Sequence, residues 1–110
     1  METSSLSDNT QHKLTLDQKL ADDLMALGII ANVTDLSRQM GKNDTYYACM
    51  RNRGYGLHIG SLVFLAAKLS KQMQNENSLR ERARIRAAVS AINETIQAKC
   101  RLREQELLAQ

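Results

Sequence analysis

The side chains that most often carry out chemistry in proteins are few in this chain, and they are widely separated. His12 and His58 stand alone, and Cys49 and Cys100 fit no metal-ligand spacing. The sequence has no glycine-rich phosphate loop and no nucleophile motif. We therefore expect a protein that is not an enzyme, with no cofactor, no metal site and no small-molecule substrate.

The chemistry that the chain does offer is positive charge, and this charge is concentrated in the middle of the sequence. Residues 1–35 carry a net charge of −4, residues 36–75 carry +5, and residues 76–110 carry +2. The only acid of the basic segment is Asp44. A basic segment in a small helical protein is typical of a nucleic-acid binder. A solvated surface produces the same pattern, so charge alone leaves both readings open.

The hydrophobic pattern predicts an all-α protein. Valine, isoleucine and threonine alternate with polar residues over no stretch of strand length. The longest apolar run, Leu62–Ala67, is too short to span a membrane, and the N-terminus lacks the features of a signal peptide. Because both thiols are expected to be free, we place the chain in the cytoplasm, associated with the nucleoid.

The chain is expected to start with a disordered tail at residues 1–13, which are polar and have no apolar period. The first helix then begins near Thr15, which suits an N-cap, and ends at Gly28. Its inward face is formed by four leucines at helical spacing, Leu16, Leu20, Leu24 and Leu27.

Three further helices are expected before residue 75. The first is short, covers residues 34–40 and is capped by Thr34. The second is also short and runs from a cap at Asn43 or Asp44 to about residue 52. The third opens near Ile59 and carries an apolar stripe of Leu62, Leu65, Ala66, Leu69 and Met73.

The two short helices and the turn between them form a helix-turn-helix motif. Ser37 must be small because the second helix crosses close over it. Gly41 can take the left-handed conformation that lets the chain reverse within a few residues. Tyr47 and Met50 are expected to anchor the second short helix. The side chains left facing outward are Asp44, Thr45, Tyr46, Ala48 and Cys49.

The chain here resembles the Cro/Xre-type, or lambda-repressor-like, helix-turn-helix family, over the stretch LSRQMGKNDTYYACMRNRGYGLHIGSLVFLAAKL (residues 36–69). Leu36–Ser37 stands at the family's usual Leu-Ala, Met40–Gly41 at its Leu-Gly, and residues 62–69 at its closing leucine- and alanine-rich helix. The resemblance implies a compact four-helix DNA-binding domain over residues 14–75. It also implies that the second short helix lies in the major groove.

The resemblance places particular residues at the DNA. Asp44, Thr45 and Tyr46 take positions that approach base edges, and Asn52 and Arg53 take positions that meet phosphate. Asp44 can accept a hydrogen bond from a cytosine amino group or can cap the helix, and we favour the cap. Tyr46 either contacts DNA or covers the domain surface. The predicted contact residues are Thr34, Lys42, Asn43, Asp44, Thr45, Tyr46, Arg51, Asn52, Arg53 and Tyr55.

Residues 76–110 are expected to form one long C-terminal helix. The steps between its central apolar residues are 4, 3 and 4, the spacing of a coiled-coil seam, which predicts dimerisation. Two alternatives stay open: the seam folds back on the chain's own domain, or the arginine-rich first turns clamp DNA phosphate. The predicted dimerisation residues are Leu79, Ile85, Val89, Ile92, Ile96 and Leu107.

Together these features predict a sequence-specific transcriptional regulator of bacterial, phage or plasmid type that binds double-stranded DNA as a homodimer. Because it has no evident effector domain, it would act by occupying a palindromic operator, most simply as a repressor. The main alternative is a protein-interaction module on the same scaffold, such as an antiactivator. The second alternative is a nucleoid-type protein that binds DNA with little sequence preference.

Overall fold

The computed structural model of the chain describes residues 4–109, and in that part every regular element is a helix. The first three residues of the expected tail lie outside the described part. The all-α fold and the long C-terminal helix are confirmed. None of the helices in this part is long and apolar enough to cross a membrane. The five helices are α1 (Ser4–Ala26), α2 (Val33–Gln39), α3 (Tyr46–Asn52), α4 (Ile59–Gln74) and α5 (Leu79–Leu108).

The first helix, α1, is longer than expected, because it begins at Ser4 and not near Thr15. Residues 4–13, for which we expected disorder, are therefore helical. These early turns have a neighbour that the sequence pattern does not reveal. Lys13 forms an ion pair of 3.1 Å with Glu106 of α5, so the start of α1 runs beside the end of the chain's last helix.

The end of α1 agrees with the prediction. Gly28 has a φ of +74°, the left-handed conformation that glycine adopts at low cost. The carbonyls of Leu27 and Gly28 accept hydrogen bonds of 3.0 and 2.9 Å from Nη1 of Arg84. Arg84 also forms an ion pair with Glu81. Arg84, in the first turns of α5, thus holds the end of α1, a role that the phosphate-clamp alternative for these arginines did not include.

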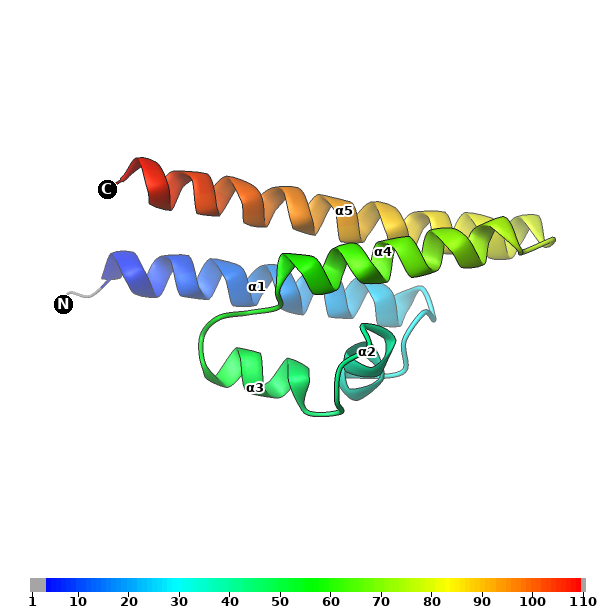
Figure 1. The fold of residues 1–110 in the computed structure, drawn as a ribbon, viewed down its shortest axis with the longest axis horizontal. Coiled ribbons are helices and arrows are strands. Elements are labelled where there is room, and N and C mark those ends of the chain that lie inside the picture. Colours follow the sequence, from blue (N-terminus) through cyan, green and yellow to red (C-terminus); the bar gives the residue numbers. More distant parts are fainter. Residues whose placement is uncertain (1–3, 110) are drawn as a thin grey trace.

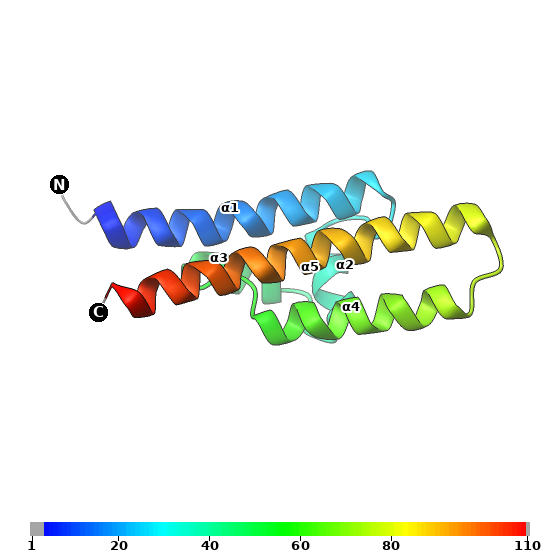
Figure 2. The same ribbon diagram turned by 90° about the horizontal axis from the view of Figure 1, so that it is seen from above.

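The helices form layers. Figure 1 shows α5 on one side of α1 and α4, with the short helices α2 and α3 on the other side. Figure 2, viewed from above, shows α5 running along the gap between α1 and α4. In agreement with both views, α5 packs against α4 and against α1. The short helices therefore form one side of the molecule, away from α5.

The core lies between the layers and takes side chains from all five helices. It is mostly aliphatic, as the scarcity of aromatic residues requires. Each such side chain contributes roughly 1.5–3 kcal/mol when it is fully buried. The large apolar side chains with the least exposure come from α1, α2, α4 and α5, and they are Leu20, Leu24, Leu36, Leu62, Leu65 and Ile92.

The predicted dimerisation seam lies inside this core. Ile92 is 0 % exposed and Ile85 is also buried, while Val89 and Ile96 are partly buried against the core. The seam therefore packs against the chain's own helices, as in the fold-back alternative. Of the predicted residues, only Leu79 and Leu107 are largely exposed, at 81 % and 55 %.

Candidate nucleic-acid interface

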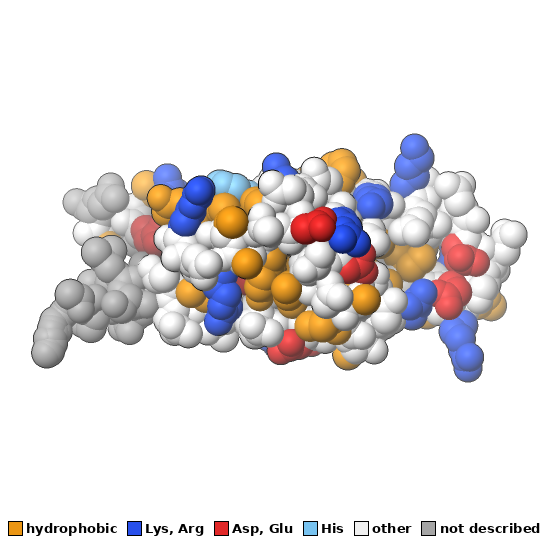
Figure 3. Space-filling view, turned by 90° about the horizontal axis from the view of Figure 1, so that it is seen from below, with side chains coloured by type: hydrophobic (Ala, Val, Ile, Leu, Met, Phe, Trp, Pro, Cys, Tyr) orange, Lys and Arg blue, Asp and Glu red, His pale blue; other side chains and the backbone are white. Residues whose placement is uncertain are grey.

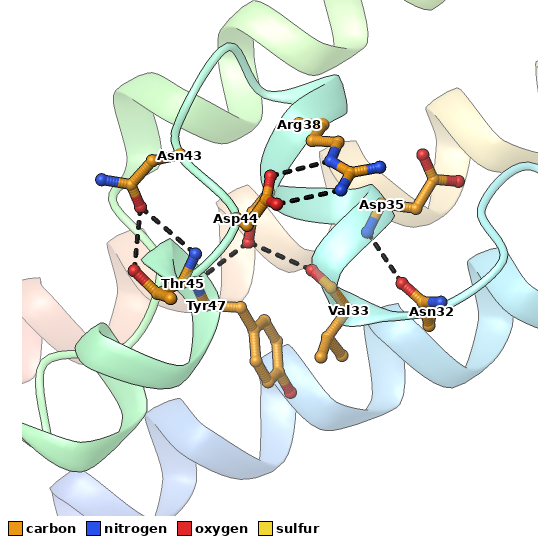
Figure 4. A network of polar contacts seen from close by, with 9 residues as sticks. Asn32, Val33, Asp35, Arg38, Asn43, Asp44, Thr45 and Tyr47 are labelled. Atoms are coloured by element: carbon orange, nitrogen blue, oxygen red, sulfur yellow. Dashed lines mark hydrogen bonds and ion pairs between the residues drawn. The ribbon is translucent and has the colours of Figure 1, made fainter.

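The two short helices and their connection, which we call the α2–α3 unit (residues 33–52), are joined through one buried hydroxyl. Ser37 is fully buried, and its Oγ accepts a hydrogen bond of 3.0 Å from the backbone N–H of Tyr47. The same hydroxyl donates to the carbonyl of Val33 at 3.1 Å. Figure 4 shows both contacts, one within α2 at Val33 and one to Tyr47 of α3. The requirement for a small residue at this position is confirmed, and the hydroxyl adds a direct bond to α3.

The turn after α2 is made by Gly41, as expected. Its φ is +76°, and its N–H donates to the carbonyl of Arg38 at 2.9 Å. The next N–H, of Lys42, donates to the carbonyl of Ser37 at 3.0 Å. These bonds satisfy carbonyls that the end of a helix leaves free. A side chain at position 41 would also meet the ring of Phe64, 3.5 Å from the place of a Cβ atom.

The start of α2 differs from the prediction. Its N-cap is Asn32, whose Oδ1 accepts a hydrogen bond of 2.9 Å from the N–H of Asp35. Asp35 in turn accepts a hydrogen bond of 2.9 Å from the N–H of Ala31. This reciprocal arrangement resembles a capping box. Thr34, which we expected to be the cap, lies within the helix and is half-buried.

The start of α3 also differs. The residue at its N-cap is Thr45, which makes no capping hydrogen bond through its side chain. Asn43 Oδ1 instead accepts hydrogen bonds from the N–H and Oγ1 of Thr45, at 3.2 and 3.0 Å, and so shapes the turn before the helix. Asp44, for which a capping role was favoured, does not cap.

Asp44 faces Arg38 of α2 instead. Its two carboxylate oxygens accept hydrogen bonds of 2.7 and 2.9 Å from Nε and Nη2 of Arg38 (Figure 4). The hydrogen bond from Arg38 lowers the pKa of the Asp44 carboxyl below its ordinary value. The carboxylate is therefore ionised at neutral pH and is paired within the α2–α3 unit.

Tyr46 covers the surface of the domain. Its hydroxyl lies 3.2 Å from Ser61 Oγ and accepts a hydrogen bond of 3.2 Å from the N–H of His58. Lys42 lies above its ring, with Nζ 5.6 Å from the ring centre, within the range of a cation–π contact. The hydroxyl is thus engaged by the start of α4, and the half-buried ring carries a cation on its outer face.

The remaining predicted contact residues are open to solvent on the α2–α3 side. Figure 3 shows this side, where Lys and Arg side chains are spread out with acidic side chains among them and do not form one continuous patch. Arg51, at the end of α3, and Arg53, at its C-cap, bring positive charge to that end of the helix. The exposed members of the predicted set are Lys42, Asn43, Asp44, Thr45, Arg51, Asn52, Arg53 and Tyr55.

The loop that follows α3 is held by a buried ion pair that we did not predict. Lys99 Nζ lies 2.8 Å from Asp17 Oδ1, and the two side chains are only 6 % and 4 % exposed. Asp17 Oδ2 accepts a hydrogen bond of 2.7 Å from the N–H of Leu57, and Lys99 donates to the carbonyl of Leu57 at 2.9 Å. The N–H and the carbonyl of Leu57 are therefore both hydrogen-bonded, the N–H to α1 and the carbonyl to α5.

The surroundings of this ion pair are tight. Burial raises the pKa of Asp17 above its ordinary value, and the charge and hydrogen bonding of Lys99 act in the opposite direction. Gly56 has a φ of +72°, and a Cβ atom there would lie 2.7 Å from Asp17 Oδ2. The sequence signals only the acid of this pair, because Asp17 shares a helical face with Leu20 and Leu24. A charge at an inward position requires a partner.

Within residues 4–109, no group of three or more His, Cys, Asp or Glu side chains is arranged to hold a metal ion. Comparisons with models of protein families, with curated proteins and with solved structures found no match. The resemblance to phage repressors therefore remains a prediction from the sequence.

Proposed function

We propose that the chain binds double-stranded DNA through the α2–α3 unit and regulates transcription by occupying an operator, most simply as a repressor. The observation that carries the proposal is the bond between Ser37 Oγ and the N–H of Tyr47, which fixes α3 against α2. A helix held in this way presents a constant set of side chains to the major groove. In this proposal α3 is the helix that enters the groove.

The exposed residues suit the two tasks of such an interface. Arg51 and Arg53 lie at one end of α3, where guanidinium groups release counterions when they meet phosphate. Asn43 and Thr45 lie at the other end of α3, where short polar side chains reach base edges. Affinity and sequence preference would therefore come from different ends of the same helix.

A homodimer on a palindromic site remains part of the proposal, with one change. Because Ile85 and Ile92 belong to the core, two copies must pair through a face other than the predicted seam. The stoichiometry of the complex is therefore measured together with its affinity. Sedimentation of the protein with one half-site and with two half-sites distinguishes single copies from a pair.

The proposal is tested with DNA that the protein itself selects from a random pool. Arg53→Ala should weaken binding to selected and random duplexes alike and should reduce the salt slope by about 1, because it removes a phosphate contact. Affinity is measured by fluorescence anisotropy between about 50 and 200 mM salt. Arg101→Ala, an exposed arginine of α5 on the other side of the molecule, is the matched control.

The possible results separate the candidate functions. Selective binding by the wild type that Arg53→Ala weakens, while Arg101→Ala does not, supports a regulator. Tight binding without selection supports a nucleoid-type protein. Equal losses in both variants contradict the proposed orientation, and no binding at low salt contradicts DNA binding altogether.

One observation favours a second function, a protein-interaction module. Val63 and Phe64 are half exposed on α4, and Phe64 lies beside the Gly41 turn. Large apolar side chains that remain exposed to solvent can mark a surface for protein contacts. If no DNA is bound at low salt, Phe64→Ala tests this function, and it should leave folding intact while abolishing binding to a protein partner.

A further inference from the structure

The candidate interface contains one acidic side chain, Asp44, which forms an ion pair with Arg38. Asp44 is the only acid of residues 36–75, and it lies between Asn43 and Thr45 on the exposed turn of the α2–α3 unit. Its side chain is 55 % exposed and that of Arg38 is 63 % exposed. The pair is thus placed where DNA would approach, and neither member serves the core.

The geometry of the pair is bidentate. Nε and Nη2 of Arg38 each donate to a different oxygen of Asp44. This fork arrangement orients the guanidinium more strongly than a single contact does. The pair has no net charge, so it releases no counterions when a phosphate approaches. Asp44 therefore cancels one of the arginines that the basic segment carries.

We propose that Asp44 limits non-specific DNA binding by holding Arg38 in this pair, so that removal of the carboxylate turns Arg38 into a phosphate contact. The inference rests on the proposed function and concerns its specificity. An interface with fewer phosphate contacts depends more on its base contacts, because phosphate contacts add affinity for every sequence equally. Asp44 is thus a specificity-determining residue that need not touch a base.

The experiment compares two substitutions that each remove one carboxylate from an exposed ion pair. Asp44→Asn releases Arg38, whereas Asp23→Asn releases Lys19 on α1, where the two side chains pair at 2.9 Å. On a random-sequence duplex, Asp44→Asn should bind about three- to tenfold more tightly near 0.1 M salt, with a salt slope steeper by about 0.9. Asp23→Asn should leave the slope unchanged and the affinity within about twofold.

A second set of variants tests whether the gain in DNA affinity of Asp44→Asn depends on Arg38. Arg38→Gln leaves Asp44 uncompensated on the interface, so it should bind random DNA more weakly than the wild type. The double variant Arg38→Gln with Asp44→Asn should return close to the wild-type affinity and slope. Circular dichroism melting checks that each variant is folded at the temperature of the measurement.

Each result decides the matter. Equal behaviour of Asp44→Asn and Asp23→Asn, with wild-type DNA binding intact, overturns the inference alone. A loss of affinity in Asp44→Asn that is confined to sites with a cytosine at one position also overturns it, because Asp44 would then read a base directly. Absence of binding by the wild type and by Asp44→Asn at low salt overturns both the inference and the proposed function.

Discussion

Ser37 acts as the cap that α3 lacks. Thr45 stands at the N-cap position but makes no capping bond with its side chain, and the first N–H groups of a helix have no partner within the helix. One of these groups, on Tyr47, donates to the Ser37 hydroxyl of α2. A residue that looks like a packing requirement in the sequence is thus also the polar link between the two helices.

At this scale we predict that Ser37→Ala destabilises the protein by about 1–3 kcal/mol, because it leaves the buried N–H of Tyr47 without an acceptor. The better helix propensity of alanine offsets this by about half a kcal/mol. Urea unfolding followed by circular dichroism measures the change. Ser90→Ala, at an exposed position of α5, is the control and should be neutral or slightly stabilising. A loss of similar size in the control would contradict this account of Ser37.

Local spacing explains which single residues could be predicted. Ser37, Gly41 and Tyr47 follow from the packing of two short helices joined by a tight turn, and their burial or conformation agrees. Asp44 does not, because a carboxylate just before a helix suits a cap. Its partner Arg38 lies six residues earlier, across the turn, and only the three-dimensional path of that turn brings the two together.

Between elements, the ion pair of Asp17 and Lys99 connects α1, α5 and the loop after α3. Substitution of one member leaves the other charge buried and alone, and one backbone group of Leu57 also loses its partner. Lys99→Met is therefore expected to lower the free energy of unfolding by about 3–5 kcal/mol. Chemical denaturation gives the value, and Lys71→Met, at an exposed position of α4, is the control.

The double variant Asp17→Asn with Lys99→Met makes this prediction more specific. Because no isolated charge then remains buried, it should be more stable than Lys99→Met alone. If the double variant is less stable than either single variant, the loss of stability in Lys99→Met does not come from an isolated buried charge.

The ion pair of Asp17 and Lys99 shows what helix periodicity can predict and what it cannot. Leu20 and Leu24 define the inward face of α1, and this face includes position 17. Periodicity can therefore place a charge on a buried face, but it does not name the partner. Lys99 is more than eighty residues away along the chain, and no local pattern relates it to Asp17.

For the whole molecule, a last helix with this spacing can either pair two copies of the chain or complete the core of one. The steps of 4, 3 and 4 are shared by coiled-coil seams and by any helix that packs along its length against neighbours. Sequence spacing therefore predicted α5 and the inward positions of Ile85 and Ile92, but it also included Leu79 and Leu107, which are exposed. It could not decide whether the covering surface belongs to another chain.

The structure gives a definite expectation for Ile92→Asp. Because Ile92 is fully enclosed by its own chain, a carboxylate there should cost about 4 kcal/mol or more and unfold much of the protein. Leu79→Asp, at an exposed position of the same helix, should stay within about 0.5 kcal/mol of the wild type. Circular dichroism and light scattering together provide the measurement. A folded Ile92→Asp protein of half the wild-type mass would restore the dimer seam and contradict this fold.

The hydrogen bonds of Asp17 and Lys99 to Leu57 also have a consequence for the order in which the chain folds during synthesis. Its two partners lie 40 residues before and 42 residues after it in the sequence. At ordinary rates of translation, the loop after α3 is made on the order of seconds before Lys99 exists to hold it. A nascent chain that has just completed α3 therefore lacks the lysine that holds this loop, and the face of α1 that packs against α5 is uncovered. If the α2–α3 unit binds DNA as we propose, the loop beside it is held in place only after α5 has packed against α1 and α4.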